Sequence, residues 1–114
     1  MSEPKEYTTE EVRKKFLEQV WNNIHFWDEL VSGKTIKERL QGLAFSILAT
    51  LDGCDIDLPA FIVAPLPHEN DKEYLIENEE NYFPENHEND VNADISGCLH
   101  DSFHRVGKDM GIIE

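Results

Sequence analysis

The spacing of apolar residues near the N-terminus is the feature that most restricts the fold of this chain. Between Thr8 and Gly33, apolar side chains recur every three or four residues, which is the period of one face of an α-helix. They are Val12, Phe16, Val20, Ile24, Trp27 and Val31. Thr8 and Glu11 have the spacing of a capping box, and Ser32-Gly33 ends the pattern. The sequence therefore predicts one long helix between Thr8 and Ser32.

Leu17 and Trp21 lie beside the centre of this apolar stripe. Exposed tryptophan is uncommon in a monomer, so we expect both side chains to be buried. The alternative is that they form an apolar surface for a partner.

A second helix is predicted to begin at Thr35. Its inward positions are Ile36, Leu40, Leu43, Ile47, Leu48 and Leu51. Residues 43–51 are apolar on nearly all sides, as in a central, buried helix. Periodicity also allows a strand within 43–51, and this choice stays open.

The second half of the chain predicts shorter elements. Residues 58–64 contain a β-rich run between Pro59 and Pro65, which indicates a small or edge strand. Asn70 or Asp71 can cap a short helix, and a C-terminal helix is expected from Asp90 to Val106. The predicted fold is α+β and predominantly helical, and it forms a single domain over residues 1–114. The helix within residues 1–33 either packs in the core of this domain or lies at its periphery.

Charge is distributed unevenly along the chain. The net charge is −14, from 24 acidic and 10 basic residues. Residues 1–40 are nearly balanced, with eight acids and seven bases, whereas residues 69–94 hold ten acids and the single base Lys72. Nucleic-acid binding depends on basic residues that neutralise phosphates, so direct binding to DNA or RNA is not expected. A basic protein surface is the partner that such a segment favours.

Other classes of protein are excluded on similar grounds. No apolar stretch approaches the roughly 20 residues of a membrane span. Cys54 and Cys98 form no CxxC pair and no disulfide framework, so free thiols in a reducing cytoplasm are expected.

A metal site is the alternative that the histidines raise. His100 and His104 stand four residues apart, a spacing at which two imidazoles on one helix can share a metal such as zinc. His87 is the candidate third ligand, with Glu88, Asp101 and His68 as others. Helical geometry counted from Val91 places both rings away from the apolar face. Zinc is therefore the cofactor of this alternative, and no cofactor is expected otherwise.

Catalytic motifs are weak by comparison. Asp52, Asp55 and Asp57 share one loop, but the pattern is shorter than an EF-hand and turn formation explains it. Ser46 and Ser102 have no GxSxG context, and neither cysteine has a local catalytic signature.

Several strings in the second half of the chain carry a resemblance. They are GLAFSILATLDG at 42–53, LPAFIVAP at 58–65, PH at 67–68, DKEY at 71–74 and DISG at 94–97. Over about residues 36–105, the chain resembles a group of small, acidic, uncharacterised proteins that bacterial phages and prophages encode. The resemblance implies a mobile-element accessory protein that binds a host protein, and it implies no activity or catalytic residue.

These observations favour a binding role over catalysis. The first hypothesis is a phage or prophage accessory protein that inhibits or modulates a host protein, for instance one that handles nucleic acid, by mimicry of nucleic acid in anti-defence or host takeover. The residues expected to contact the partner are Glu73, Glu77, Glu79, Glu80, Glu85, Glu88 and Asp90. The alternatives are a metal-binding domain or metal-dependent enzyme that uses His100 and His104, and a structural or oligomerisation module built on the first helix. The sequence leaves the oligomeric state open.

Overall fold

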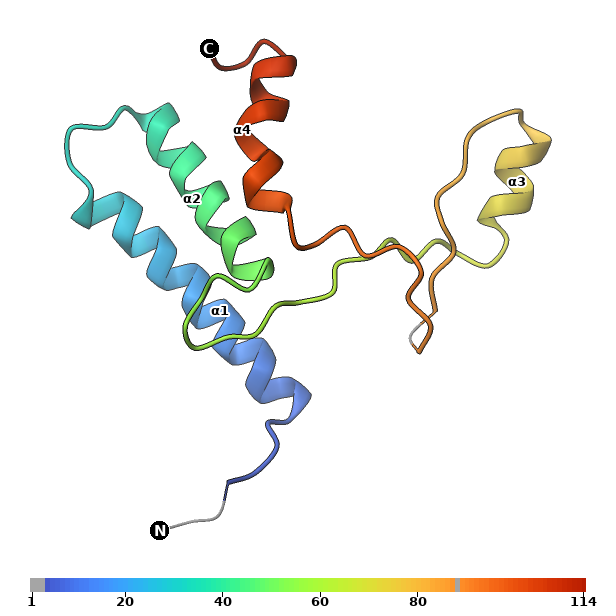
Figure 1. The fold of residues 1–114 in the computed structure, drawn as a ribbon, viewed down its shortest axis with the longest axis horizontal. Coiled ribbons are helices and arrows are strands. Elements are labelled where there is room, and N and C mark those ends of the chain that lie inside the picture. The colour runs from blue at the N-terminus through green and yellow to red at the C-terminus, as the bar shows by residue number, and fades with distance from the viewer. Residues whose placement is uncertain (1–3, 88) are drawn as a thin grey trace.

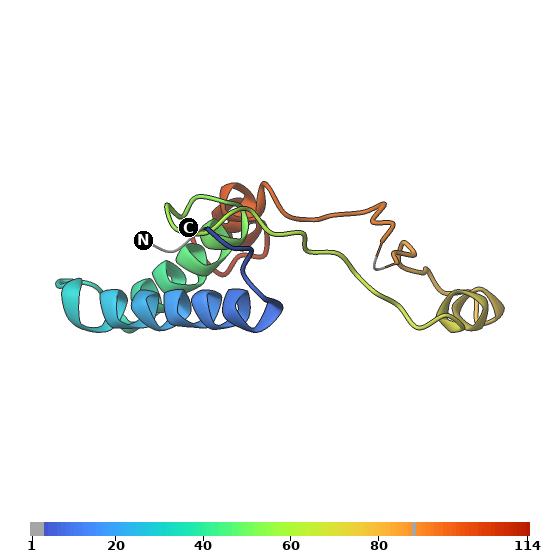
Figure 2. The ribbon, with the colours of Figure 1, turned by 90° about the horizontal axis from the view of Figure 1, so that it is seen from below.

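The fold is a group of packed helices from which a long arm extends (Figure 1). The structure is a computed structural model that describes residues 4–87 and 89–114. Its elements are α1 (Thr9–His25), the π-helix η1 (Phe26–Leu30), α2 (Ile36–Leu51), α3 (Asp71–Glu77) and α4 (Leu99–Asp109). The arm comprises residues 64–96 and carries α3 near its far end (Figure 2).

Both N-terminal helices begin where the sequence predicts. Thr8 caps α1 and Thr35 caps α2, each in a complete capping box with the glutamate three residues later. The open choice for residues 43–51 is resolved as helix, because α2 continues to Leu51. Both helix starts are therefore marked by hydrogen bonds between residues three apart in the sequence.

Helix α2 is the central element, and it packs against α1, η1 and α4. Trp27 of η1 lies over Gly42 of α2, and its indole Nε1 donates a hydrogen bond of 2.9 Å to Ser46 Oγ. Phe16 of α1 packs edge-on against Phe61, with ring centroids 5.4 Å apart. These contacts place the small core around α2.

The predicted α+β class is wrong, because the described residues contain no strand and no sheet. Leu58 lies in a bend and residues 59–64 have no regular secondary structure, because their backbone groups bond to other partners. The Phe61 N–H donates to Leu51 O, and the Val63 N–H donates to a carboxylate oxygen of Asp94. With Pro59 and Pro65 at its ends, this segment lies against the end of α2 and the return of the arm.

The C-terminal helix also differs from its prediction. It begins at Leu99 and not at Asp90, because Gly97 has φ +108° and the Asp94 side chain accepts the Ser96 N–H in a local turn. The helix continues past Gly107 to Asp109. The short helix α3 was predicted correctly, although its N-cap residue Asn70 makes no side-chain capping bond.

The molecule is far from compact. Its radius of gyration is 18.1 Å, whereas about 13 Å is typical of a compact domain of this length. Its accessible surface is 9394 Å², against about 6,400 Å² for a folded monomer of this mass. Leu58 is the one large hydrophobic side chain that counts as buried in the described part of the chain. Much apolar surface therefore remains available for contact with other molecules.

The burial expected for Leu17 and Trp21 is not observed. Their exposed fractions are 51% and 69%, on the outer side of α1. The arm supplies no element to cover α1, since α3 contacts none of the other described helices.

Candidate functional site

Two features of the structure can carry function: a cluster of polar side chains where α2 meets α4, and the acidic arm. Asp52, directly after α2, organises the first. Its carboxylate accepts the Gly97 N–H at 2.6 Å and the His100 N–H at 2.8 Å. Cys98, the N-cap residue of α4, makes no side-chain capping bond. Asp52 thus caps α4 from another helix, which joins α2 to α4 at this point.

His100 lies between Asp52 and a thiol. Its Nδ1 is 2.5 Å from Asp52 Oδ2, and its Nε2 is 3.6 Å from Cys54 Sγ. The Asp52 side chain has no exposed surface, and the His100 side chain is 19% exposed. Nε2 is also 3.3 Å from Asp101 Oδ1 at the surface. One nitrogen of the imidazole is therefore held by a buried carboxylate, while the other faces a cysteine.

The turn after α2 sets the position of Cys54. Gly53 has φ +91°, a conformation that favours glycine, and its neighbour Ala60 leaves no room for a Cβ there. The Cys54 N–H donates to Ala49 O at 2.9 Å. The sulfur is thus placed by backbone geometry, and the residue is exposed.

The ionisation of Asp52 and His100 is shifted in the direction of a charged pair. Burial alone would raise the pKa of Asp52, but the His100 side chain and the N–H groups of His100 and Gly97 outweigh it and hold that pKa below its ordinary value. The hydrogen bond to Asp52 raises the pKa of His100, against its partial desolvation. The pair therefore favours imidazolium and carboxylate.

The histidines proposed for a metal are arranged differently from the expectation. His100 and His104 both contact Phe45 of α2, with ring centroids 5.7 Å and 5.6 Å away, so the expectation that both rings point away from the apolar face was wrong. His87 lies in the arm, where its backbone exchanges two hydrogen bonds with Asp90. Among residues 4–87 and 89–114, no three His, Cys, Asp or Glu side chains are grouped to hold a metal ion. The metal site remains a prediction.

The acidic arm is the second feature. Nine of its ten acidic residues are described, and all nine are exposed. Of the residues expected to contact a partner, Glu73 and Glu77 lie on α3, Glu79 and Glu80 follow it directly, and Glu88 lies outside the described residues. Glu85 pairs with Lys72 at 3.6 Å. The arm thus carries a net charge of −9, from ten acids and one base, away from the packed helices.

Side chains that bond to backbone hold the two sides of the arm together. The buried Asn86 donates to Pro65 O at 2.8 Å and accepts the N–H groups of Asn92 and Ala93 at 2.7 and 3.0 Å. Nearer the helices, Asp94 accepts the Val63 N–H at 2.8 Å. Hydrogen bonds from Ser96 and Val63 lower the pKa of Asp94, so this carboxylate stays ionised and serves as a hydrogen-bond acceptor within the fold.

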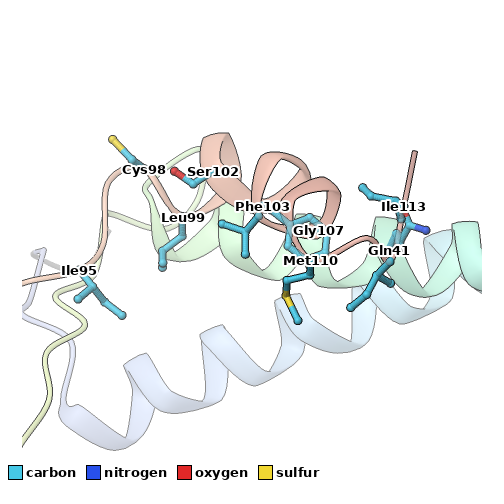
Figure 3. Close-up of a pocket in the computed structure, with 11 residues that line it drawn as sticks. Gln41, Ile95, Cys98, Leu99, Ser102, Phe103, Gly107, Met110 and Ile113 are labelled. Carbon is cyan, nitrogen blue, oxygen red and sulfur yellow. The ribbon is translucent and has the colours of Figure 1, made fainter.

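An apolar hollow lies beside α4 (Figure 3). Its volume is about 480 Å³, and α4 and the C-terminal residues form most of its wall, with Gln41 of α2 and Ile95 at the edges. Apolar side chains dominate the lining, which consists of Gln41, Ile95, Cys98, Leu99, Ser102, Phe103, Val106, Gly107, Met110, Ile112 and Ile113. No residue of this lining has a charged side chain.

Sequence reasoning missed the cluster of Asp52, Cys54 and His100. Asp52 and Cys54 are 48 and 46 residues from His100, and no motif spans that distance. The closest signal was the resemblance, whose strings include both Asp52-Gly53 and the approach to α4 at Gly97.

Comparisons with known proteins give no family. The chain matches no protein-family profile, no curated protein and no solved structure. Within the part of the chain that the structure describes, every helix is too short or too polar to cross a membrane.

Proposed function

We propose that the protein binds a partner protein through its acidic arm, and that the binding surface of the partner is basic. The observation that carries this proposal is the placement of nine exposed carboxylates on an arm whose one helix, α3, contacts no other described helix. Like charges held close together repel one another and destabilise the free arm. A basic partner would remove that repulsion.

Solubility alone explains this arrangement poorly. Charge that serves solubility is most effective when it is spread over the surface with both signs mixed. Here residues 1–40 are nearly balanced, and the arm holds ten acids against one base. The concentration of one sign on a projecting element supports recognition.

The arm also offers apolar groups beside its acids. Tyr74, Ile76, Tyr82 and Phe83 are all at least half exposed. Aromatic residues are enriched in the buried centres of protein interfaces, and charged residues are found at the rims. The arm therefore has both parts of a protein-binding surface.

The resemblance to phage and prophage proteins supports a particular setting. The partner in this proposal is a host protein, and one that handles nucleic acid has a basic surface of the required kind. Inhibition by mimicry of nucleic acid, in anti-defence or host takeover, follows from that chemistry. The cytoplasm is the proposed location, where the free thiols of Cys54 and Cys98 stay reduced.

A charge-neutralised variant tests the proposal. Glu73, Glu77, Glu79 and Glu80 are changed together to glutamine, and capture of proteins from a bacterial lysate is measured at rising salt. The matched control changes Glu6, Glu10, Glu18 and Glu29, four exposed acids outside the arm. We expect salt-sensitive capture that the arm variant loses and the control variant keeps. Capture that is insensitive to salt and to the arm variant would contradict the proposal.

The exposed residues of α1 favour a second candidate, an oligomerisation module. Leu17 and Trp21 form an uncovered apolar pair on α1. Sedimentation of the wild type and of Trp21→Lys tests it: an oligomer that dissociates in the variant supports self-association, and a wild-type monomer excludes it.

A further inference from the structure

Cys54, His100 and Asp52 are arranged as a nucleophile, a base and a group that orients the base. His100 Nε2 is 3.6 Å from the Cys54 sulfur, and Nδ1 is 2.5 Å from the buried Asp52 carboxylate. Cysteine and serine acyl-transfer enzymes of unrelated folds use this order of groups. We propose that these three residues form a nucleophilic centre that transfers acyl groups from small activated esters or thioesters to water.

The chemistry assigns a role to each residue. His100 Nε2 takes the proton of the Cys54 thiol, which gives the imidazolium that Asp52 favours, and the Cys54 sulfur attacks the acyl carbon. The C–S bond forms, the bond from the acyl carbon to the ester oxygen or thioester sulfur breaks, and the leaving group takes the proton from His100. Water then attacks the new thioester with His100 as base, so the acid is released and the thiol is restored.

Asp52 is the positioning residue of this centre. Its carboxylate keeps the Nδ1 proton on its own side of the ring, so that Nε2 faces the sulfur, with the exposed Asp101 carboxylate also 3.3 Å away. It also stabilises the imidazolium that forms when the thiol loses its proton. The Gly97 and His100 N–H groups donate hydrogen bonds to the same carboxylate. The position of the Asp52 carboxylate is therefore fixed by the contact between the end of α2 and the start of α4.

The surroundings of Cys54 indicate the class of substrate. The residue is exposed at a turn, so an acyl donor can reach the sulfur directly from solvent. Such a site suits acyl donors whose leaving group departs readily, because the open surface offers little binding energy to activate a stable amide. Esters of acidic alcohols and thioesters meet this requirement.

The protein contains its own control thiol. Cys98 is also exposed, at the N-cap of α4, and no hydrogen bond to a histidine is found for it in the described residues. The whole wild-type chain is treated with p-nitrophenyl acetate at pH 7, quenched in acid, digested and analysed by mass spectrometry. General-base assistance contributes about 100-fold or more in developed active sites, and we expect Cys54 to be acetylated at least about 10-fold faster than Cys98.

Three variants refine the test. Cys98→Ser should keep the release of p-nitrophenolate, and Cys54→Ser should lose it. His100→Gln, confirmed as folded by circular dichroism, should reduce acetylation of Cys54 to the rate of Cys98. If this variant does not fold, the ratio within the wild type decides alone.

Equal acetylation of the two thiols in the wild type would overturn the proposal. Fast acetylation of Cys54 without further turnover would also overturn it, because the centre would then not transfer the acyl group. The proposal goes beyond binding by the arm and does not depend on it, since all three residues lie outside residues 64–96.

Discussion

The packing of Trp27 on Gly42 gives the sharpest stability prediction, for the change Gly42→Ala. A Cβ built on Gly42 would lie 2.5 Å from three carbon atoms of the Trp27 ring. Real Cβ atoms do not approach other atoms so closely, so either the indole or the helix must move. The indole is also tied to Ser46 by its Nε1 hydrogen bond. A shift of the ring therefore costs packing and this bond together.

The magnitude follows from opposing terms. Overpacking of a close contact costs about 1–3 kcal/mol. Loss of the bond between Trp27 and Ser46 adds about 1 kcal/mol. The better helix propensity of alanine returns about 1 kcal/mol. We expect a net destabilisation of about 1–3 kcal/mol, and about 4–8 °C of melting temperature for each kcal/mol in a domain near this size.

The control is Gly107→Ala, at the other glycine within an α-helix. A Cβ at Gly107 would meet only the outer atoms of Ile113, at 3.1 and 3.2 Å, and this flexible side chain near the C-terminus can yield. That variant should melt at or slightly above the wild-type temperature. Thermal unfolding followed by circular dichroism measures both variants. A Gly42→Ala protein as stable as Gly107→Ala would refute the packing of Trp27 on α2.

Three further predictions concern polar contacts. The difference in free energy of unfolding between the wild type and Asp52→Asn should be largest between about pH 4 and pH 6.5. Because the pKa of Asp52 is lowered in the folded protein, its contribution to stability is lost as the pH falls below the ordinary aspartate pKa of 3.8. Because the pKa of His100 is raised, its contribution is lost as the pH rises past the ordinary histidine pKa of 6.5. Melting curves across pH measure this difference, and a constant value would contradict the pairing. Asn86→Ala should weaken the arm locally by about 1–3 kcal/mol, seen as faster amide exchange at Asn92 with α2 unaffected. Equal exchange in both proteins would exclude the bond. Thr35→Ala should lower stability by about 1 kcal/mol in chemical unfolding, because it removes the cap of α2. An unchanged unfolding midpoint would show that this cap contributes nothing.

The starts of α1 and α2 could be predicted from the sequence because their signals are local. Thr8 and Glu11, and likewise Thr35 and Glu38, satisfy each other within one helical turn, so four residues suffice to place each start. The change from α1 to the π-helix η1 had no such signal. It coincides with the packing of Trp27 on Gly42, a contact between residues far apart in sequence.

The small strand was mispredicted because β-propensity describes a residue and not its partner. Residues 60–64 have the composition of a strand, but a strand needs a neighbour with free backbone groups. The neighbours here are Leu51 O at the end of α2 and the side chain of Asp94. A related reason explains why the cluster of Asp52, Cys54 and His100 was missed. Only the contact between α2 and α4 brings these three residues together.

The arm and the helices differ in what holds them together, and this difference bears on binding. Asn86 and Asp94 order the arm mainly through hydrogen bonds to backbone groups, with little apolar burial. Segments of this kind open locally at low free energy, because few buried contacts must be broken. The acids of the arm repel one another in the free protein, and the apolar side chains beside them stay in water. A basic partner would relieve both costs at once, so we expect binding to order the arm more than it changes the helices.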